Sequence, residues 1–131
     1  MARYDSRVAS AATGIPAGWV SSLLTRVPVT GVSRGRQGRR RTLSLDAVVC
    51  VVLARLLTEH AGASCEAAVA TAHELLRSSA GAITWGPSLM RLSCDVEELR
   101  RRLRWDLDRA VELAVEVPRG RPRGRTIEAS S

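Results

Sequence analysis

The sequence predicts a mainly α-helical fold with one short β-hairpin, and three observations carry this prediction. Apolar residues recur at steps of three and four over several segments, which is the spacing of one helix face. Ser44, Ser64 and Asp95, which favour helix N-caps, stand directly before three of these segments. Two short runs with β-branched residues enclose the Arg- and Gly-rich residues 33–41, as in a hairpin. The 131 residues fit one compact domain with tails, or two very small modules.

Two helices separated by a tight turn are expected at the N-terminus, over residues 5–12 and 16–25. Gly14 permits the turn, and Pro16 suits the first turn of a helix, where its missing N–H would have no partner. Apolar spacing predicts the inner face of each helix: Val8, Ala11 and Ala12 in the first, and Val20, Leu23 and Leu24 in the second. A helix, a tight glycine turn and a second helix form a helix-turn-helix.

The hairpin is expected directly after these helices. Val27–Val32 is rich in β-branched residues and contains Pro28, which suits a short edge strand. Residues 33–41 would form a basic loop, and Thr42, Leu43 and Leu45 the returning strand. A hairpin with an Arg-rich tip has the shape of a wing. The predicted fold is therefore a mainly α, winged helix-turn-helix with an additional C-terminal helix and a disordered basic tail.

Three further helices complete the prediction. Residues 47–60 are apolar nearly all round, which indicates a buried central helix. Residues 65–78 form the next, with Ala68, Ala72 and Leu75 facing inward. These elements give a domain over residues 1–78, and residues 79–94 are a linker or a small hairpin around Gly86-Pro87-Ser88.

Residues 95–117 predict a long amphipathic helix, which Pro118 ends. Asp95 and Glu98 have the spacing of a capping box, and Glu97–Arg101 and Glu98–Arg102 are favourable four-residue pairs. Trp105, like Trp85, is expected to be buried. The apolar stripe would either form a homodimer seam or fold back on its own domain; it comprises Val96, Leu99, Leu103, Leu107, Ala110, Ala114 and Val117.

Positive charge is concentrated at the two ends of the chain. The formal net charge is +7 and the isoelectric point is about 11.1. Residues 1–42 hold eight Arg and one acid, whereas residues 118–131 hold four Arg and one acid. The residues between these ends carry a small negative charge. A merely solvated surface predicts mixed signs, so this segregation indicates binding to a polyanion, and nucleic acid is the commonest one.

Other classes of site have little support in the sequence. Cys50, Cys65 and Cys94 are too widely spaced for a zinc site and odd in number, which indicates buried thiols in a reducing compartment. We find no nucleophile–base set, phosphate loop or carboxylate pair, and therefore expect neither an enzyme nor a cofactor. The longest apolar run, 47–54, is too short to cross a membrane, and no signal peptide is recognisable. We expect a cytoplasmic, nucleoid-associated protein.

Residues from Tyr4 to about Leu76 resemble the DNA-binding domain of the MerR family. Val8-Ala9 with Thr13-Gly14-Ile15 are similar to the first helix and turn of that family. Gly38-Arg39-Arg40-Arg41 and Leu43-Ser44-Leu45-Asp46 are similar to its wing and wing exit, and Ala61-Gly62-Ala63-Ser64 with Ala67-Ala68 to the entry of its fourth helix. The resemblance implies a winged helix-turn-helix that binds DNA, and a helix at 95–117 that dimerises.

The C-terminal residues 118–131 resemble an AT-hook in Pro118-Arg119-Gly120-Arg121-Pro122. The minor groove is only about 6 Å wide. Gly120 lets the backbone approach the groove floor, the prolines keep the chain extended, and the arginines lie along the groove, where A·T tracts deepen the negative potential. Such a tail is expected to order on DNA.

These observations define a predicted interface with double-stranded DNA. The second helix would enter the major groove, and the wing and tail would contact backbone or minor groove. Trp19 matches a DNA-facing position of the MerR family and is expected near DNA, with a place in the core as the alternative. The predicted contact residues are Pro16, Ala17, Gly18, Trp19, Ser21, Ser22, Arg26, Arg34, Arg36, Gln37, Arg39, Arg40, Arg41, Arg119, Gly120, Arg121, Pro122, Arg123 and Arg125.

The best interpretation is a sequence-specific transcriptional regulator that represses by occupying an operator, similar to the immunity repressors of temperate phages. Two alternatives remain open. One is an excisionase or DNA-bending architectural protein, since excisionases resemble the same winged fold. The other is an adaptor whose 95–117 helix binds a protein partner, with the basic tail as an electrostatic aid.

Overall fold

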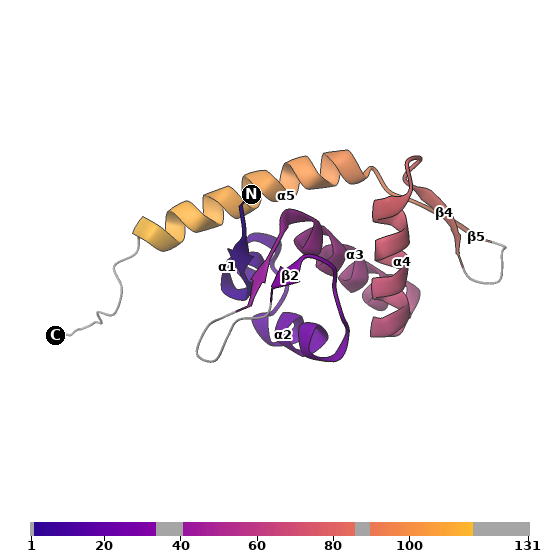
Figure 1. Cartoon of the computed structure of the whole chain (residues 1–131), viewed down its shortest axis with the longest axis horizontal. Coiled ribbons are helices and arrows are strands. Elements are labelled where there is room, and N and C mark those ends of the chain that lie inside the picture. Colours follow the sequence, from indigo (N-terminus) through magenta and orange to yellow (C-terminus); the bar gives the residue numbers. More distant parts are fainter. Residues whose placement is uncertain (1, 34–40, 86–89, 117–131) are drawn as a thin grey trace.

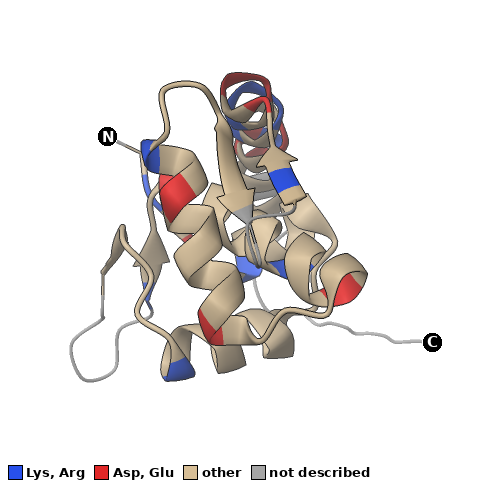
Figure 2. Ribbon diagram, turned by 90° about the vertical axis from the view of Figure 1, so that its right-hand side faces the viewer, with Lys and Arg blue, Asp and Glu red and all other residues tan. Residues whose placement is uncertain are grey.

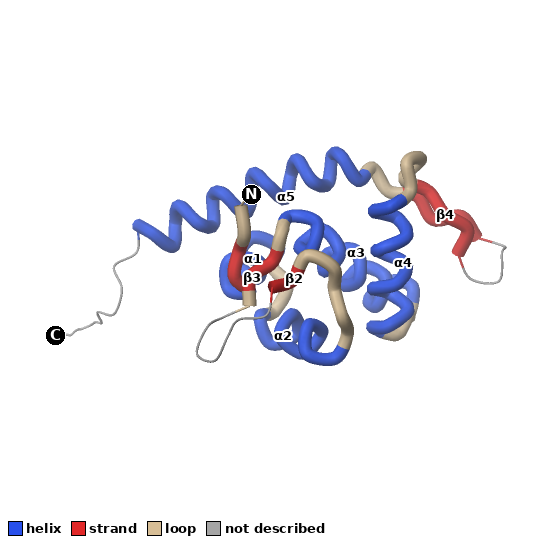
Figure 3. The backbone as a smooth tube through the Cα atoms, in the orientation of Figure 1, coloured by secondary structure: helices blue, strands red, loops and turns tan. Residues whose placement is uncertain are grey.

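The computed structural model describes residues 2–33, 41–85 and 90–116, and 66% of these residues are helical (Figures 1 and 3). The mainly α prediction is therefore confirmed. In the described ranges the helices are α1 (Ser6–Thr13), α2 (Ala17–Arg26), α3 (Leu45–Ala61), α4 (Cys65–Arg77) and α5 (Val96–Glu116). The strands are β1 (Tyr4–Asp5), β2 (Val32–Ser33), β3 (Thr42–Leu43), β4 (Ala82–Trp85) and β5 (Met90–Ser93).

Side-chain caps fix the starts of four helices. The Asp5 carboxylate accepts from the Val8 amide at 2.8 Å and begins α1. The hydroxyls of Ser44 and Ser64 begin α3 and α4, each through a 3.2 Å hydrogen bond from the amide three residues later. Asp95 begins α5 by accepting from the Glu98 amide at 3.0 Å. The caps that the sequence predicted at Ser44, Ser64 and Asp95 are thus present.

A three-stranded antiparallel sheet in the order β1-β3-β2 contacts α1 through β1 and α3 through β3. Its strands are two residues long, and Leu43 pairs with both Tyr4 and Val32. The predicted strand Val27–Val32 is wrong except at its last residue, because Val27 and Val29 are buried in the core outside any ladder. Leu45 is the first residue of α3 instead of a strand residue, because Ser44 caps the helix there.

Helix α3 forms the centre of the hydrophobic core, with eight buried residues. The predicted inner residues of α2 and α4 are buried as expected. The prediction for α1 is partly wrong, because Ala9 is buried whereas Ala11 is exposed. The face that α1 turns inward is set by its packing against both α2 and α5, so the spacing within α1 alone does not determine it.

Helix α5 lies across α1 and α3, and its C-terminal end reaches beyond them (Figure 1). Leu103 and Leu107 belong to the same hydrophobic core as the N-terminal helices. The N-terminal part of the apolar stripe therefore packs within the chain and offers no free dimer seam, whereas Ala114 is exposed and Val117 lies outside the described residues.

The prediction that Trp105 is buried is wrong, since 69% of this residue is exposed. Trp105 is two positions from both Leu103 and Leu107, which is about 200° around a helix and so on the opposite face. The side chain of Trp85 is not described.

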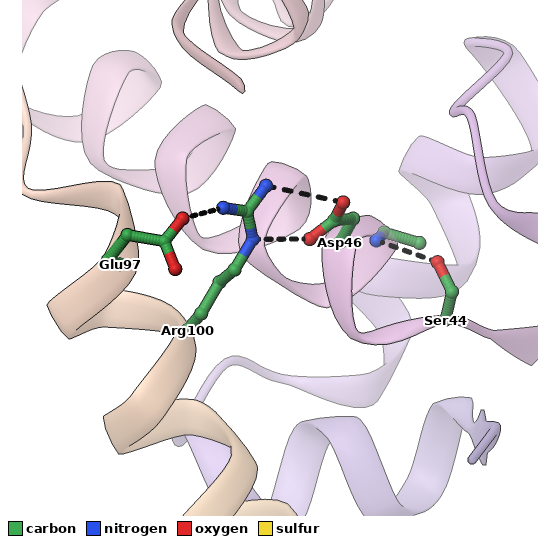
Figure 4. Close-up of polar contacts among 5 residues, drawn as sticks. Ser44, Asp46, Glu97 and Arg100 are labelled. Atoms are coloured by element: carbon green, nitrogen blue, oxygen red, sulfur yellow. Dashed lines mark hydrogen bonds and ion pairs between the residues drawn. The ribbon is translucent and has the colours of Figure 1, made fainter. Parts of the chain in front are cut away.

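Ion pairs secure the start of α5 against α3 (Figure 4). The Arg100 guanidinium donates to Asp46 from Nε at 2.7 Å and from Nη2 at 3.3 Å, and it also contacts Glu97. These carboxylates raise the pKa of Arg100. Glu97 therefore pairs with Arg100 and not with Arg101 as predicted, whereas the predicted pair of Glu98 and Arg102 forms at 2.8 Å.

Strands β4 and β5 form the small hairpin considered for residues 79–94, with Ala82 opposite Ser93 and Trp85 opposite Met90. Figures 1 and 3 show these strands beyond α4, at the end of the molecule away from the free end of α5. No helix in the described ranges has both the length and the apolar character needed to span a membrane.

Candidate nucleic-acid interface

The solvent face of α2 carries small side chains and no acid. Val20, Leu23 and Leu24 anchor the helix in the core, so the opposite side faces outward. That side is exposed and consists of Ala17, Gly18, Ser21, Ser22 and Thr25. Small side chains allow the helix backbone to approach a flat or grooved surface closely, and the hydroxyl groups can donate or accept hydrogen bonds there. Of the predicted contact residues, the structure thus brings together those of α2, except Trp19.

The N-terminus of α2 has no side-chain cap. Pro16 occupies the N-cap position, and no side chain accepts from the first turn. Ala17 and Gly18 are exposed there, and the first turn holds no acidic residue. A helix N-terminus carries partial positive charge, so this end of α2 is electrostatically suited to an anionic group.

Trp19 faces the protein and not the solvent face of α2. It is half-buried and packs against the core. The Arg55 guanidinium of α3 lies 4.9 Å from the centre of its ring, in a cation–π contact, and Arg55 also pairs with Glu59 at 3.0 Å. The position of Trp19 is therefore explained by intramolecular contacts, and its predicted place near DNA has no support in this geometry.

Two arginines border the exposed face of α2. Arg26 is exposed at its C-terminal end, and its Nη2 lies 3.5 Å from the Cys65 sulfur at the start of α4. Arg41, just before β3, donates from Nη2 to the Thr25 hydroxyl at 2.9 Å and from Nη1 to the Ser21 carbonyl at 3.3 Å. The beginning of β3 is thereby bonded to the helix face itself.

Sequence reasoning missed three residues that shape this surface: Arg3, Thr25 and Arg55. Arg3 donates from Nε to the Thr42 hydroxyl at 2.8 Å and from Nη2 to the carbonyls of Gly31 and Thr42 at 2.8 and 2.9 Å. These contacts join residues far apart in the chain, so no local sequence pattern predicts them. Thr25 could have been found, because it lies one turn after Ser21 on the predicted helix face.

The remaining predicted contact residues lie outside the described parts of the chain. In the loop between β2 and β3 these are Arg34, Arg36, Gln37, Arg39 and Arg40, and in the tail they are Arg119, Gly120, Arg121, Pro122, Arg123 and Arg125. Their roles stay predictions from the sequence.

Charge on the described surface is distributed unevenly. In Figure 2, red and blue segments alternate along α5, which is seen nearly end-on at the top. On this helix Glu98 pairs with Arg101 and Arg102, and these hydrogen bonds lower the pKa of Glu98 to about 2. The face of α2, in contrast, has cationic neighbours and no carboxylate among its own residues. The face of α2 is therefore better suited to an anion than the mixed surface of α5.

Two of the three cysteines, Cys50 and Cys94, lie in surroundings that disfavour the reactive thiolate form. Burial raises the pKa of the Cys50 thiol to about 12, and burial together with Asp95 raises the pKa of Cys94. Both thiols are thus protonated and unreactive at neutral pH. Within the described ranges, no three His, Cys, Asp or Glu side chains gather as a metal site would need.

Comparison with known proteins finds no relative of this chain. No family model, no curated protein and no solved structure matches the chain.

Proposed function

We propose that this chain binds double-stranded DNA through the exposed face of α2 and regulates transcription by occupying its site. The single observation that carries the proposal is that face: small, hydroxyl-bearing, free of acids and bordered by Arg26 and Arg41. It lies within the segment that holds the excess positive charge of the chain. A helix of this kind suits the major groove, which admits an α-helix and presents a distinct hydrogen-bonding pattern for each base pair.

The order of the elements supports a winged helix-turn-helix as the finer description of the fold. Helices α1 and α2 are joined at Gly14, which adopts a left-handed φ of 77°, and the β2–β3 pair, α3 and α4 follow. This is the order that the resemblance to the MerR family implies. In such a domain the second helix contacts base edges, and the hairpin and the tail contribute phosphate or minor-groove contacts.

Repression by occupancy is the form of regulation that requires the fewest functional parts in the chain. A protein that blocks an operator needs an interface and affinity but no second state controlled by a ligand. We accordingly propose a sequence-specific repressor, with the AT-hook-like tail adding affinity through its effective concentration near the bound site.

The proposal is tested by placing a negative charge on the α2 face. Ser22→Glu changes an exposed residue, so the fold should persist while the new carboxylate meets phosphate oxygens. The matched control is Ala70→Glu, which makes the same charge change at an exposed position of α4. In an electrophoretic shift with duplex DNA, Ser22→Glu should weaken binding at least tenfold, or about 1.4 kcal/mol. Equal effects of the two variants would contradict the proposed interface.

The exposure of Trp105 favours a second candidate function, an adaptor that binds a protein partner through α5. Tryptophan is enriched in the centres of protein interfaces, and Trp105 is exposed beside Arg101, Arg102 and Asp106, which could form part of a polar rim around it. The two functions are separated by deleting residues 118–131 and neutralising the hairpin arginines. An adaptor would keep its activity in this variant, whereas a DNA-bound repressor would lose it.

A further inference from the structure

The β2–β3 pair is too short to fix its own orientation. Its ladder has only two residue pairs, Val32 with Leu43 and Ser33 with Thr42. A two-stranded ribbon of this length is marginal without packing partners. Contacts from outside the ladder must therefore hold it in place relative to α2.

Arg41 supplies such a contact on the side of α2. Its two terminal nitrogens donate to Thr25 and Ser21, at 2.9 and 3.3 Å. The Thr25 hydroxyl in turn donates to the Ser21 carbonyl at 2.8 Å. The three groups thus form a closed set of hydrogen bonds, in which Thr25 is both donor and acceptor. Arg41 is half-buried, as a residue lying along the protein surface would be.

Arg3 also secures the start of β3. It bonds both the hydroxyl and the carbonyl of Thr42, the residue next to Arg41, and also the Gly31 carbonyl ahead of β2. Two arginines therefore hold the start of β3: Arg41 extends from it to α2, and Arg3, which directly precedes β1, reaches it from the N-terminal segment. Only the first of them joins the hairpin to the exposed helix face.

We propose that Arg41 is a positioning residue, which holds the β2–β3 hairpin at a fixed angle to α2, and not a direct phosphate contact. This inference rests on the proposed DNA-binding function and refines the role first predicted for Arg41. Because α2 and the hairpin would contact neighbouring parts of one DNA site, their relative angle decides whether both fit at once. Arg41 therefore raises the affinity for the preferred DNA site through its contact with Thr25, and contributes less to the general electrostatic attraction for DNA.

The guanidinium geometry explains why arginine is needed. Its planar fork places two nitrogens to reach a hydroxyl and a carbonyl together. Lysine keeps the charge but has one ammonium on a flexible stem, so it cannot hold the same two acceptors in a fixed geometry. Arg41→Lys therefore separates charge from positioning.

The test compares full-length Arg41→Ala, Arg41→Lys, Thr25→Val and the double variant Arg41→Ala/Thr25→Val with the wild type, and Arg91→Ala is the control for charge loss at an exposed arginine of β5. The probes are a duplex that the wild type enriches from a random-sequence pool and a scrambled duplex of equal composition. Fluorescence anisotropy at several salt concentrations gives affinity, selectivity and salt slope. Thermal melting verifies that each variant is folded.

Positioning predicts that Arg41→Ala, Arg41→Lys and Thr25→Val each lose about tenfold in affinity for the enriched duplex, the size expected for coupling between contacting residues. The double variant Arg41→Ala/Thr25→Val should lose no more affinity than Arg41→Ala or Thr25→Val alone. The salt slope of Arg41→Lys should equal that of the wild type. Losses that multiply in the double variant, or full activity of Arg41→Lys, would overturn the proposal and indicate a phosphate contact. If the wild type enriches no duplex from the random-sequence pool, the proposed function itself fails.

Discussion

Replacing Leu107 tests whether α5 belongs to the core. Leu107 is fully buried, in the same core as α1 and α3, so Leu107→Ala removes buried carbon atoms and leaves a cavity. Such replacements cost roughly 2–5 kcal/mol. Leu113 is 54% exposed on the same helix, and Leu113→Ala makes the same chemical change. Surface replacements of this kind stay within about 0.5 kcal/mol.

Urea denaturation followed by circular dichroism measures both variants. Because the change in helix propensity is the same in each, the difference between them isolates burial. We expect Leu107→Ala to lower the free energy of unfolding by about 2 kcal/mol or more relative to Leu113→Ala. The wild-type midpoint should not depend on protein concentration. Equal stability of the two variants, or a midpoint that rises with concentration, would indicate that α5 is a dimer seam instead.

Three further predictions follow from local geometry. Gly31 has a φ of 92°, and an added Cβ would clash with the Ser44 hydroxyl that caps α3. Gly31→Ala should therefore lower the melting temperature far more than Gly62→Ala, which shares a positive φ but meets no atom within 4 Å; similar losses would contradict this. In single-tryptophan variants, iodide should quench Trp105 strongly and Trp19 weakly, and the reverse order would contradict the described exposures. Burial, aided by a nearby arginine, lowers the pKa of His73, whose Nε2 accepts a backbone amide at 3.2 Å. Its contribution to stability is thus present above the unfolded pKa and lost as pH falls through the folded one. Urea midpoints should drop between about pH 7.5 and pH 5, and drop less in His73→Gln; an equal drop would refute the role of this residue.

Local signals gave the helix starts correctly. Ser44, Ser64 and Asp95 each cap a helix, because a cap depends on a hydroxyl or carboxylate and an amide three residues later. The inner faces of α2 and α4 were also predictable, since burial follows helical spacing when a single partner covers the helix. For α1 the spacing was insufficient to predict the buried face, because α5, a segment about ninety residues later in the chain, covers part of this helix.

The errors arose where contacts join residues far apart in the chain, or where the position of a residue on its helix was not taken into account. Trp105 lies within a helix whose apolar face needs cover, and this position suggests burial, but its spacing from Leu103 and Leu107 places it on the opposite face. The strand β1 was missed because two residues show no periodicity. In the candidate interface, the face of α2 was predictable from spacing, whereas the bonds from Arg41 and Arg3 depend on tertiary packing.

The central claim, that the chain binds DNA, is tested most directly by its affinity for duplex DNA as a function of salt. Each neutralised phosphate releases counterions, so the logarithm of the binding constant should fall linearly with the logarithm of salt concentration, with a slope of about −0.9 per contact. With its positive charge concentrated at the two ends, the wild-type chain should bind at low salt and show a slope that corresponds to several phosphate contacts. Absence of binding at low salt, or binding that is indifferent to salt, would contradict the account.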